Sequence, residues 1–236
     1  MKRLVSAVAL GTVLASPAWA ADSSLDSDNA KLSYGIGVTL SRSLQQDVDK
    51  LDTDAFTQAI RDVYGDKKLK MSDEEITQTL SQYQQQKVAE QQASMEKQAN
   101  ENKAAGEKFL AQNAKKDGVK TTDSGLQYKV LTQGKGPQPK AGDQVKVNYE
   151  GKLLDGTVFD SSYERGEPVT FRVDQVIDGW QQALKMMHKG GVWMLYVPAD
   201  LAYGQAGTGG PIGPNQTLIF KVELLDVMPK GDDKQG

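Results

Sequence analysis

The hydrophobic period of this chain changes at Gly118, from the 3.6-residue repeat of a helix to the two-residue alternation of a strand. The stretch before Gly118, residues 72–117, contains no proline and is dominated by Ala, Gln, Glu and Lys, which are good helix formers. It opens with Ser72 and Glu75, the pattern of a capping box, so we expect a long connecting helix over 72–117, about 60 Å in length. The middle is polar and sustains no heptad, which predicts a solvated strut rather than a coiled coil.

Residues 21–71 show two runs of apolar side chains at helical spacing. The first run consists of Leu32, Ile36, Leu40, Leu44 and Val48, and the second follows the N-cap pattern at Asp52. Two short amphipathic helices bury too little apolar surface to form a secure core alone. We therefore expect residues 21–71 to be a helical dimerisation domain that forms a homodimer. A monomeric cap packed on the rest of the chain is the alternative.

Residues 1–20 have the layout of a cleavable signal peptide. A basic start at Lys2 and Arg3 precedes an apolar stretch, and Ala18 to Ala20 supplies the small-residue cleavage pattern. A buried N-terminal helix is the alternative. The chain contains no cysteine, which excludes a lipoprotein anchor and disulfides. These features predict export to the periplasm of a bacterial envelope, with an outer-membrane or cell-surface association left open. No further stretch approaches the roughly 18 apolar residues of a membrane span.

Residues 118–229 alternate between apolar and polar side chains in several short runs, and 230–236 form a polar tail that we expect to be disordered. Asp155 and Gly156 form a hairpin signal between two of these runs. One short helical stretch, 180–187, interrupts the strands. We therefore predict an α+β domain in which an antiparallel half-barrel sheet wraps over a single short helix, preceded by the all-α N-terminal region.

The composition excludes most familiar catalytic chemistry. With no cysteine and one histidine, His188, the chain has no thiol nucleophile and no Cys/His metal site. Its acidic residues show no metal-ligand spacing, and nothing calls for a cofactor. The glycine-rich segment 204–210 lacks the Lys-Ser or Lys-Thr of a phosphate loop and is followed by Pro211 and Pro214, so we expect a mobile loop. A formal net charge of -3 gives no field for binding nucleic acid or an anionic membrane.

Several aromatic and aliphatic segments of the C-terminal domain follow one another in a recognisable order. They are Val147 to Gly151, Asp155 to Ser162, Val176 to Trp180, Ala202 to Gly204 and Thr217 to Phe220. Together these segments resemble the FKBP family of prolyl isomerases over residues 121–227. The complete layout of signal peptide, helical domain, long helix and isomerase domain is similar to the Mip (macrophage infectivity potentiator) branch of that family, as is the loop 209–215.

The resemblance implies an apolar pocket for proline. Its floor would be Trp180, and its walls would be Tyr149, Phe159, Val176 and Phe220. Read from the residues alone, Trp180, Val176 and Phe220 could instead be ordinary core residues, which is the alternative. Val169 stands where an aromatic wall residue is common, which would make that wall thinner.

The resemblance also implies polar roles at the rim of the pocket. Ile177 would donate its backbone N–H to a substrate carbonyl, and Tyr203 would donate its hydroxyl. Asp160 would orient Tyr149 and pair with Arg165 without acting as a general acid or base. Ile212 would project from the loop onto the residue before proline. Read as local structure instead, Tyr203 would be a turn residue and Asp160 a turn cap.

Rotation about an Xaa–Pro amide breaks no bond and needs no nucleophile, which fits the missing catalytic residues. The sequence thus predicts a peptidyl-prolyl cis-trans isomerase that assists the folding of exported proteins. Its expected partners are unfolded or proline-containing polypeptides, a second copy of the chain, and macrolide FKBP inhibitors. A holdase chaperone whose cleft binds clients is the main alternative, and a surface virulence factor is a third.

Overall fold

The computed structural model describes residues 25–230. The predicted signal peptide, 1–20, lies outside these residues, as does 231–236 of the predicted tail. The chain divides into two compact units, Met1–Glu75 and Ile76–Gly236. The division falls in the first turn of a long helix, so the sheet and most of that helix belong to one unit.

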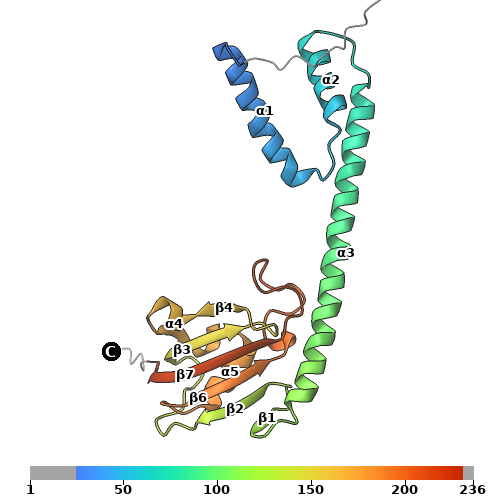
Figure 1. The fold of residues 1–236 in the computed structure, drawn as a ribbon. Coiled ribbons are helices and arrows are strands. Elements are labelled where there is room, and N and C mark those ends of the chain that lie inside the picture. The colour runs from blue at the N-terminus through green and yellow to red at the C-terminus, as the bar shows by residue number, and fades with distance from the viewer. Residues whose placement is uncertain (1–24, 231–236) are drawn as a thin grey trace, which may run out of the picture. The chain divides into compact units, whose positions relative to one another are not determined.

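The described part of the first unit contains two helices, α1 (Asp28–Asp47) and α2 (Thr53–Tyr64) (Figure 1). At the start of each helix, a capping side chain accepts hydrogen bonds from backbone N–H groups that have no carbonyl partner within the helix. The Ser27 hydroxyl accepts from the Ala30 N–H, and the Asp52 carboxylate accepts from the N–H groups of Asp54 and Ala55. Apolar side chains of α1 remain exposed in the single chain, at 62% for Leu32 and 59% for Ile36. The helical prediction for this region is confirmed, and among the described residues of this unit the apolar face of α1 remains exposed.

Helix α3 (Asp73–Asn113) begins with the predicted capping box. The Ser72 N–H donates to Glu75 at 2.8 Å, and the Glu75 N–H donates back to the Ser72 hydroxyl at 3.3 Å. The helix ends before 117, and Gly118 follows it with a φ of 76°. The prediction of a solvated strut is wrong for the last turns, where Gly106 and Asn113 are buried against the sheet domain. Asn113 packs there because its Nδ2 donates to Gln127 Oε1 at 3.0 Å, and Gly106 packs there because it has no side chain. Neither residue contributes to an apolar repeat in the sequence.

The second unit contains one antiparallel sheet in the order β1-β2-β6-β7-β3-β4, with β5 paired to the other part of β3. Its strands are β1 (Val119–Thr121), β2 (Gln127–Thr132), β3 (Gln144–Lys152), β4 (Val158–Ser161), β5 (Val169–Arg172), β6 (Val192–Val197) and β7 (Leu218–Met228). The predicted hairpin at Asp155 and Gly156 is confirmed: Gly156 has a φ of 91°, and the Leu153 N–H donates to Thr157 O at 2.9 Å. The α+β prediction is therefore confirmed.

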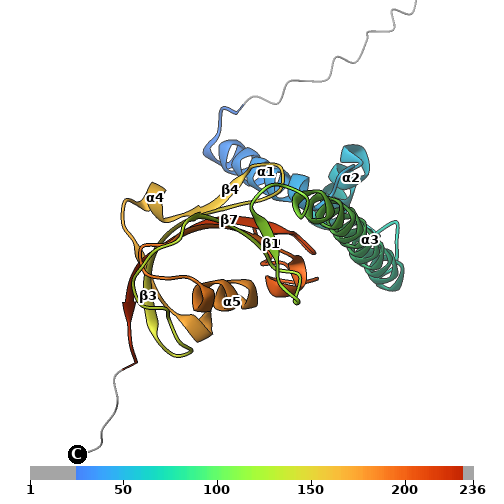
Figure 2. The same cartoon turned by 90° about the horizontal axis from the view of Figure 1, so that it is seen from below.

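The sheet curves around helix α5 (Asp178–Met186), as the view from below shows (Figure 2). Alternate residues of β3 point inward, so Val145 and Val147 are fully buried while Lys146 between them is exposed. Leu184 of α5 is also fully buried against them. Three short helices complete the unit: α4 (Ser162–Arg165), η1 (Val173–Gln175) and η2 (Ala199–Leu201). They are too short to produce a period in the sequence, and the prediction did not include them.

Candidate active site

A cavity of about 300 Å³ opens between α5 and the concave side of the sheet. Residues from β3, β4, β5, β7, α5 and the segments beside them line it: Tyr149, Phe159, Asp160, Phe171, Gln175, Val176, Ile177, Trp180, Tyr203 and Phe220. Most of these side chains are aromatic or aliphatic. The cavity is therefore suited to a small apolar group with a few polar contacts at its rim.

Trp180 forms the floor of the cavity and is 4% exposed. Other rings surround the indole edge-to-face, with centroid distances of 5.2 Å to Tyr149, 5.3 Å to Phe220 and 5.9 Å to Phe171. The preceding residue, Gly179, permits this placement, because a Cβ there would lie 2.5 Å from a methyl carbon of Val197 on β6. The buried indole N–H of Trp180 has no partner among the described residues.

Phe159 and Phe220 form one wall, and their rings meet edge-to-face at 5.6 Å. Gly151 of β3 lies beneath both rings. A Cβ on Gly151 would lie 2.6 Å from Phe159 and 2.9 Å from Phe220, so any side chain there would push the wall into the cavity. This glycine is required by close approach rather than by its backbone conformation.

A polar cluster of three residues lies at the rim. The Tyr149 hydroxyl donates to Asp160, Arg165 donates to the other oxygen of Asp160, and Arg165 Nη2 lies 3.0 Å from the Tyr149 hydroxyl. Burial alone would raise the pKa of Asp160, but hydrogen bonds from Tyr149 and Arg165 and the charge of Arg165 outweigh burial and lower this pKa. Burial and the hydrogen bond to Asp160 raise the pKa of Tyr149. At neutral pH the carboxylate is ionised and the phenol is neutral, so neither group is poised for proton transfer.

Two residues that line the cavity, Ile177 and Tyr203, carry further donors. Ile177 is the residue before the first turn of α5, and within residues 25–230 its backbone N–H donates to no protein carbonyl. An amide at the N-terminus of a helix also carries part of the positive end of the helix dipole. The side chain of Tyr203 is 41% exposed, and its hydroxyl has no protein partner in the described chain. Both groups are available to a ligand carbonyl.

The structure brings most of the predicted site residues together. All seven predicted catalytic residues line the cavity, as does Val176, and Arg165 reaches the rim through Asp160. Val169 and Ile212 are not among the lining residues. Ile212 is 5% exposed and packed with the core, and its expected contact with the residue before proline stays a prediction.

The prediction missed Phe171 and Gln175, which also line the cavity. Phe171 had a usable signal, because it is two residues from Val169 on the same strand and so shares its inward face. Gln175 lies in η1, which is too short to show a hydrophobic periodicity in the sequence. Within residues 25–230, no group of three or more His, Cys, Asp or Glu side chains is placed to hold a metal ion. The site offers aromatic surface and fixed hydrogen-bond donors.

Comparison with known proteins agrees with this geometry. Residues 136–225 match the family described as FKBP-type peptidyl-prolyl cis-trans isomerase. Residues 29–130 match the family described as the domain amino terminal to FKBP-type peptidyl-prolyl isomerase. The two matches together span both the helical region and the sheet domain.

Three relatives align with nearly the whole chain. Peptidyl-prolyl cis-trans isomerase Mip of Coxiella burnetii is 45% identical, covering 98% of this chain and 100% of that protein. Outer membrane protein MIP of Legionella longbeachae is 42% identical, covering 95% and 97%. FKBP-type peptidyl-prolyl cis-trans isomerase FkpA of Escherichia coli is 45% identical, covering 93% and 85%.

Two solved structures are also similar. The crystal structure of FkpA from Escherichia coli has a TM-score of 0.74 at 45% identity, covering 86% of this chain and 98% of that chain. A peptidyl-prolyl cis-trans isomerase from Pseudomonas syringae has a TM-score of 0.52 at 40% identity, covering 56% and 96%.

Proposed function

The chain belongs to the FKBP-type peptidyl-prolyl cis-trans isomerase family, and from this premise we propose that the aromatic cavity over Trp180 is where it twists Xaa–Pro amides. The protein is an isomerase that acts on proline-containing polypeptides in protein folding. Family membership favours isomerisation over the holdase alternative. The roles given below to individual residues are our proposal.

The reaction needs stabilisation of a twisted amide rather than a covalent intermediate. Amide resonance makes the barrier about 18–20 kcal/mol, and the uncatalysed step takes tens to hundreds of seconds. The planar amide is more polarised than the twisted one, so water stabilises it more. Moving the amide from water to the aromatic cavity therefore lowers the barrier, and each ~1.4 kcal/mol gained in the transition state is tenfold in rate.

In this proposal, each residue of the site has a role in holding the substrate that depends on its position in the cavity. Trp180 supports the face of the proline ring, and the Phe159 and Phe220 wall holds its edge. The Ile177 N–H and the Tyr203 hydroxyl donate to the substrate carbonyls on either side and so fix the backbone while the amide rotates. Asp160 stays ionised and keeps the Tyr149 ring in place through its hydroxyl.

The observation that carries this proposal is the ring cage around Trp180. The chain offers an internal control, because Trp193 is 2% exposed and its indole N–H likewise lacks a partner, yet it stacks on Tyr128 outside the cavity. Titration of ¹⁵N-labelled protein with an Ala-Leu-Pro-Phe peptide should shift the indole signal of Trp180 and leave that of Trp193 in place. Movement of Trp193 with no movement of Trp180 would contradict the site assignment.

We also propose that the protein is a homodimer joined through its N-terminal helices. The exposed apolar side chains of α1 line a groove that includes Leu32, Ile36 and Leu40, a surface of the kind that obligate dimers bury. Replacing Ile36 by Glu in the full chain should halve the mass measured by light scattering. Val88→Glu, at a 53% exposed site of α3 outside the groove, is the matched control and should remain dimeric. A dimeric Ile36→Glu protein would contradict the proposal.

Export to the bacterial envelope is our proposal for location. It rests on the signal-peptide pattern of residues 1–20 and on the similarity to a relative named an outer membrane protein. In the part of the chain that the structure describes, no helix is long and apolar enough to cross a membrane. Mass spectrometry of the protein recovered from a periplasmic extract should find Ala21 as its first residue, whereas an intact Met1 would contradict cleavage.

A further inference from the structure

The loop 204–217 connects the end of the cavity at Tyr203 to β7, and two side-chain hydrogen bonds attach it to α3. Asn102 Nδ2 donates to the carbonyl oxygen of Pro214 at 2.8 Å. Asn215 Nδ2 donates to the carbonyl oxygen of Ala99 at 3.3 Å. Each bond satisfies a backbone oxygen of the other segment, so the helix and the loop hold each other (Figure 1).

A close backbone approach lies one turn further along α3. A Cβ on Gly106 would lie 2.3 Å from the hydroxyl oxygen of Thr217, so only glycine lets the helix lie this close to the start of β7. Glycine inside a helix is destabilising relative to alanine. Its presence here, buried and without a positive φ, is explained by the contact with Thr217. We call Asn102, Gly106 and Asn215 the helix–loop clamp.

The clamp lies close in sequence to two cavity residues, and a backbone hydrogen bond also connects it to the residue after one of them. The Asn215 N–H donates to the carbonyl oxygen of Gly204 at 2.8 Å, which closes the loop at the residue after Tyr203. At the other end, Thr217 precedes Phe220 of the cavity wall by three positions on β7. One residue, Asn215, therefore joins α3 to the backbone beside Tyr203.

We propose that the helix–loop clamp positions Tyr203 for the reaction, which makes the last turns of α3 part of the catalytic module. This inference rests on the proposed function of the cavity. Among residues 25–230 the Tyr203 hydroxyl has no hydrogen-bond partner and the side chain is 41% exposed, so no side-chain hydrogen bond of its own holds Tyr203 in place. If the clamp is released, the loop loses its fixed conformation and must be ordered again when substrate binds. The free energy of this ordering lowers kcat/KM.

Asn102→Asp in the full chain is the sharpest test. The substitution preserves shape but places a carboxylate against the Pro214 oxygen in place of a donor. Losing a hydrogen bond of ordinary net strength should lower kcat/KM for a proline tetrapeptide by about twofold to thirteenfold. Asn100→Asp, an exposed site two residues away on α3, makes the same charge change and should leave kcat/KM unchanged. Asn102→Ala, which removes the donor without adding charge, should behave like Asn102→Asp.

Two readouts distinguish positioning from a general loss of structure. Amide exchange measured by NMR should quicken at Thr208 and Asn215 in the loop and stay unchanged in the β3–β7 ladder. In a double-mutant cycle with Tyr203→Phe, the effect of Asn102→Asp on kcat/KM should largely disappear, because both changes remove the same contact to substrate.

The outcomes separate this inference from the proposed function. Unchanged kcat/KM in folded Asn102→Asp and Asn102→Ala proteins would overturn the clamp. An equal loss with and without the Tyr203 hydroxyl would also overturn it, since the clamp would then act elsewhere. If the unchanged chain failed to catalyse isomerisation at all, the proposed function of the cavity would fail instead.

Discussion

Removing the hydroxyl of Tyr203 should lower kcat/KM without changing the free energy of unfolding. The hydroxyl has no protein partner in the described chain and the side chain is 41% exposed, so Tyr203→Phe should change the free energy of unfolding by less than about 0.5 kcal/mol. The same hydroxyl is proposed to donate to a substrate carbonyl. A neutral hydrogen bond has a net value of about 0.5–1.5 kcal/mol, which corresponds to a fall of about twofold to thirteenfold in kcat/KM.

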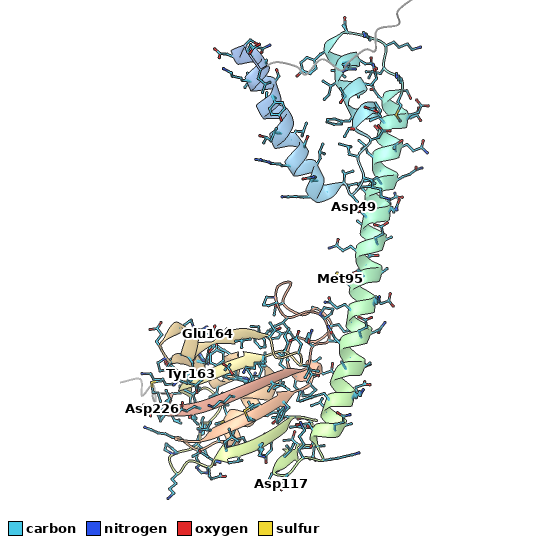
Figure 3. The ribbon with its side chains drawn as sticks, viewed as in Figure 1. Asp49, Met95, Asp117, Tyr163, Glu164 and Asp226 are labelled. Atoms are coloured by element: carbon cyan, nitrogen blue, oxygen red, sulfur yellow. The ribbon has the colours of Figure 1, made fainter. Side chains whose placement is uncertain are left out.

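Tyr163→Phe is the matched control for this prediction. Tyr163 is 43% exposed, lies on α4 beside Glu164 (Figure 3), and is not among the residues that line the cavity. Its hydroxyl donates to Glu223 at 3.3 Å across the sheet surface. Losing that exposed bond should leave kcat/KM unchanged and cost at most a few tenths of a kcal/mol of stability.

The assay is the catalysed cis-to-trans relaxation of an Ala-Leu-Pro-Phe peptide, with urea unfolding of each variant measured in parallel. The expected result is lower kcat/KM for Tyr203→Phe at unchanged stability, and no change in kcat/KM for Tyr163→Phe. Equal kcat/KM in all three proteins would refute the assigned role of the Tyr203 hydroxyl. A large loss of stability in Tyr203→Phe would refute the claim that this hydroxyl is free.

Three further perturbations test the cavity and its support. Because the folded pKa of Asp160 is lowered, its contribution to stability is complete above the unfolded pKa of about 3.9 and is lost as pH falls through the folded pKa. In urea unfolding, Asp160→Asn should therefore be less stable than the unchanged chain at pH 7, by up to about 1 kcal/mol for this part-exposed ion pair, and the difference should shrink as pH falls below the unfolded pKa; a constant difference would contradict the pKa direction. Gly151→Ala should push Phe159 and Phe220 inward, costing about 1–3 kcal/mol of unfolding free energy and most of the activity, whereas normal peptide kinetics would show that the rings can move aside. Leu184→Ala, at a fully buried site of α5, should cost about 2–5 kcal/mol by the same measurement, and a loss below 1 kcal/mol would mean that α5 is loosely packed.

The periodicity of the sequence predicts most of this fold because burial follows from it directly. Alternation along β3 places Val145 and Val147 inside, and the capping box at Ser72 begins α3 where expected. The docking of α3 was missed because Asn102 and Gly106 act through a hydrogen bond and a close approach, and neither leaves a hydrophobic repeat.

The candidate site was predicted from the order of sequence motifs rather than from hydrophobic periodicity. Site residues outside these motifs were therefore missed. Motifs place the rings of Tyr149, Phe159 and Trp180 well because strand and helix geometry fixes their directions. Ile212 lies in a loop, where no strand or helix geometry fixes the direction of its side chain, and this apolar side chain is buried in the core. Phe171 was overlooked although the inward face of β5 includes it.

The central claim is that the cavity over Trp180 catalyses rotation about Xaa–Pro amides without a covalent step. The most direct test is the cis-to-trans relaxation of a proline tetrapeptide with purified residues 21–236, with and without a macrolide FKBP inhibitor. We expect acceleration that the macrolide abolishes, because both ligands require the same aromatic cavity. Folded protein that gives no acceleration, or acceleration that a saturating macrolide leaves intact, would contradict the account.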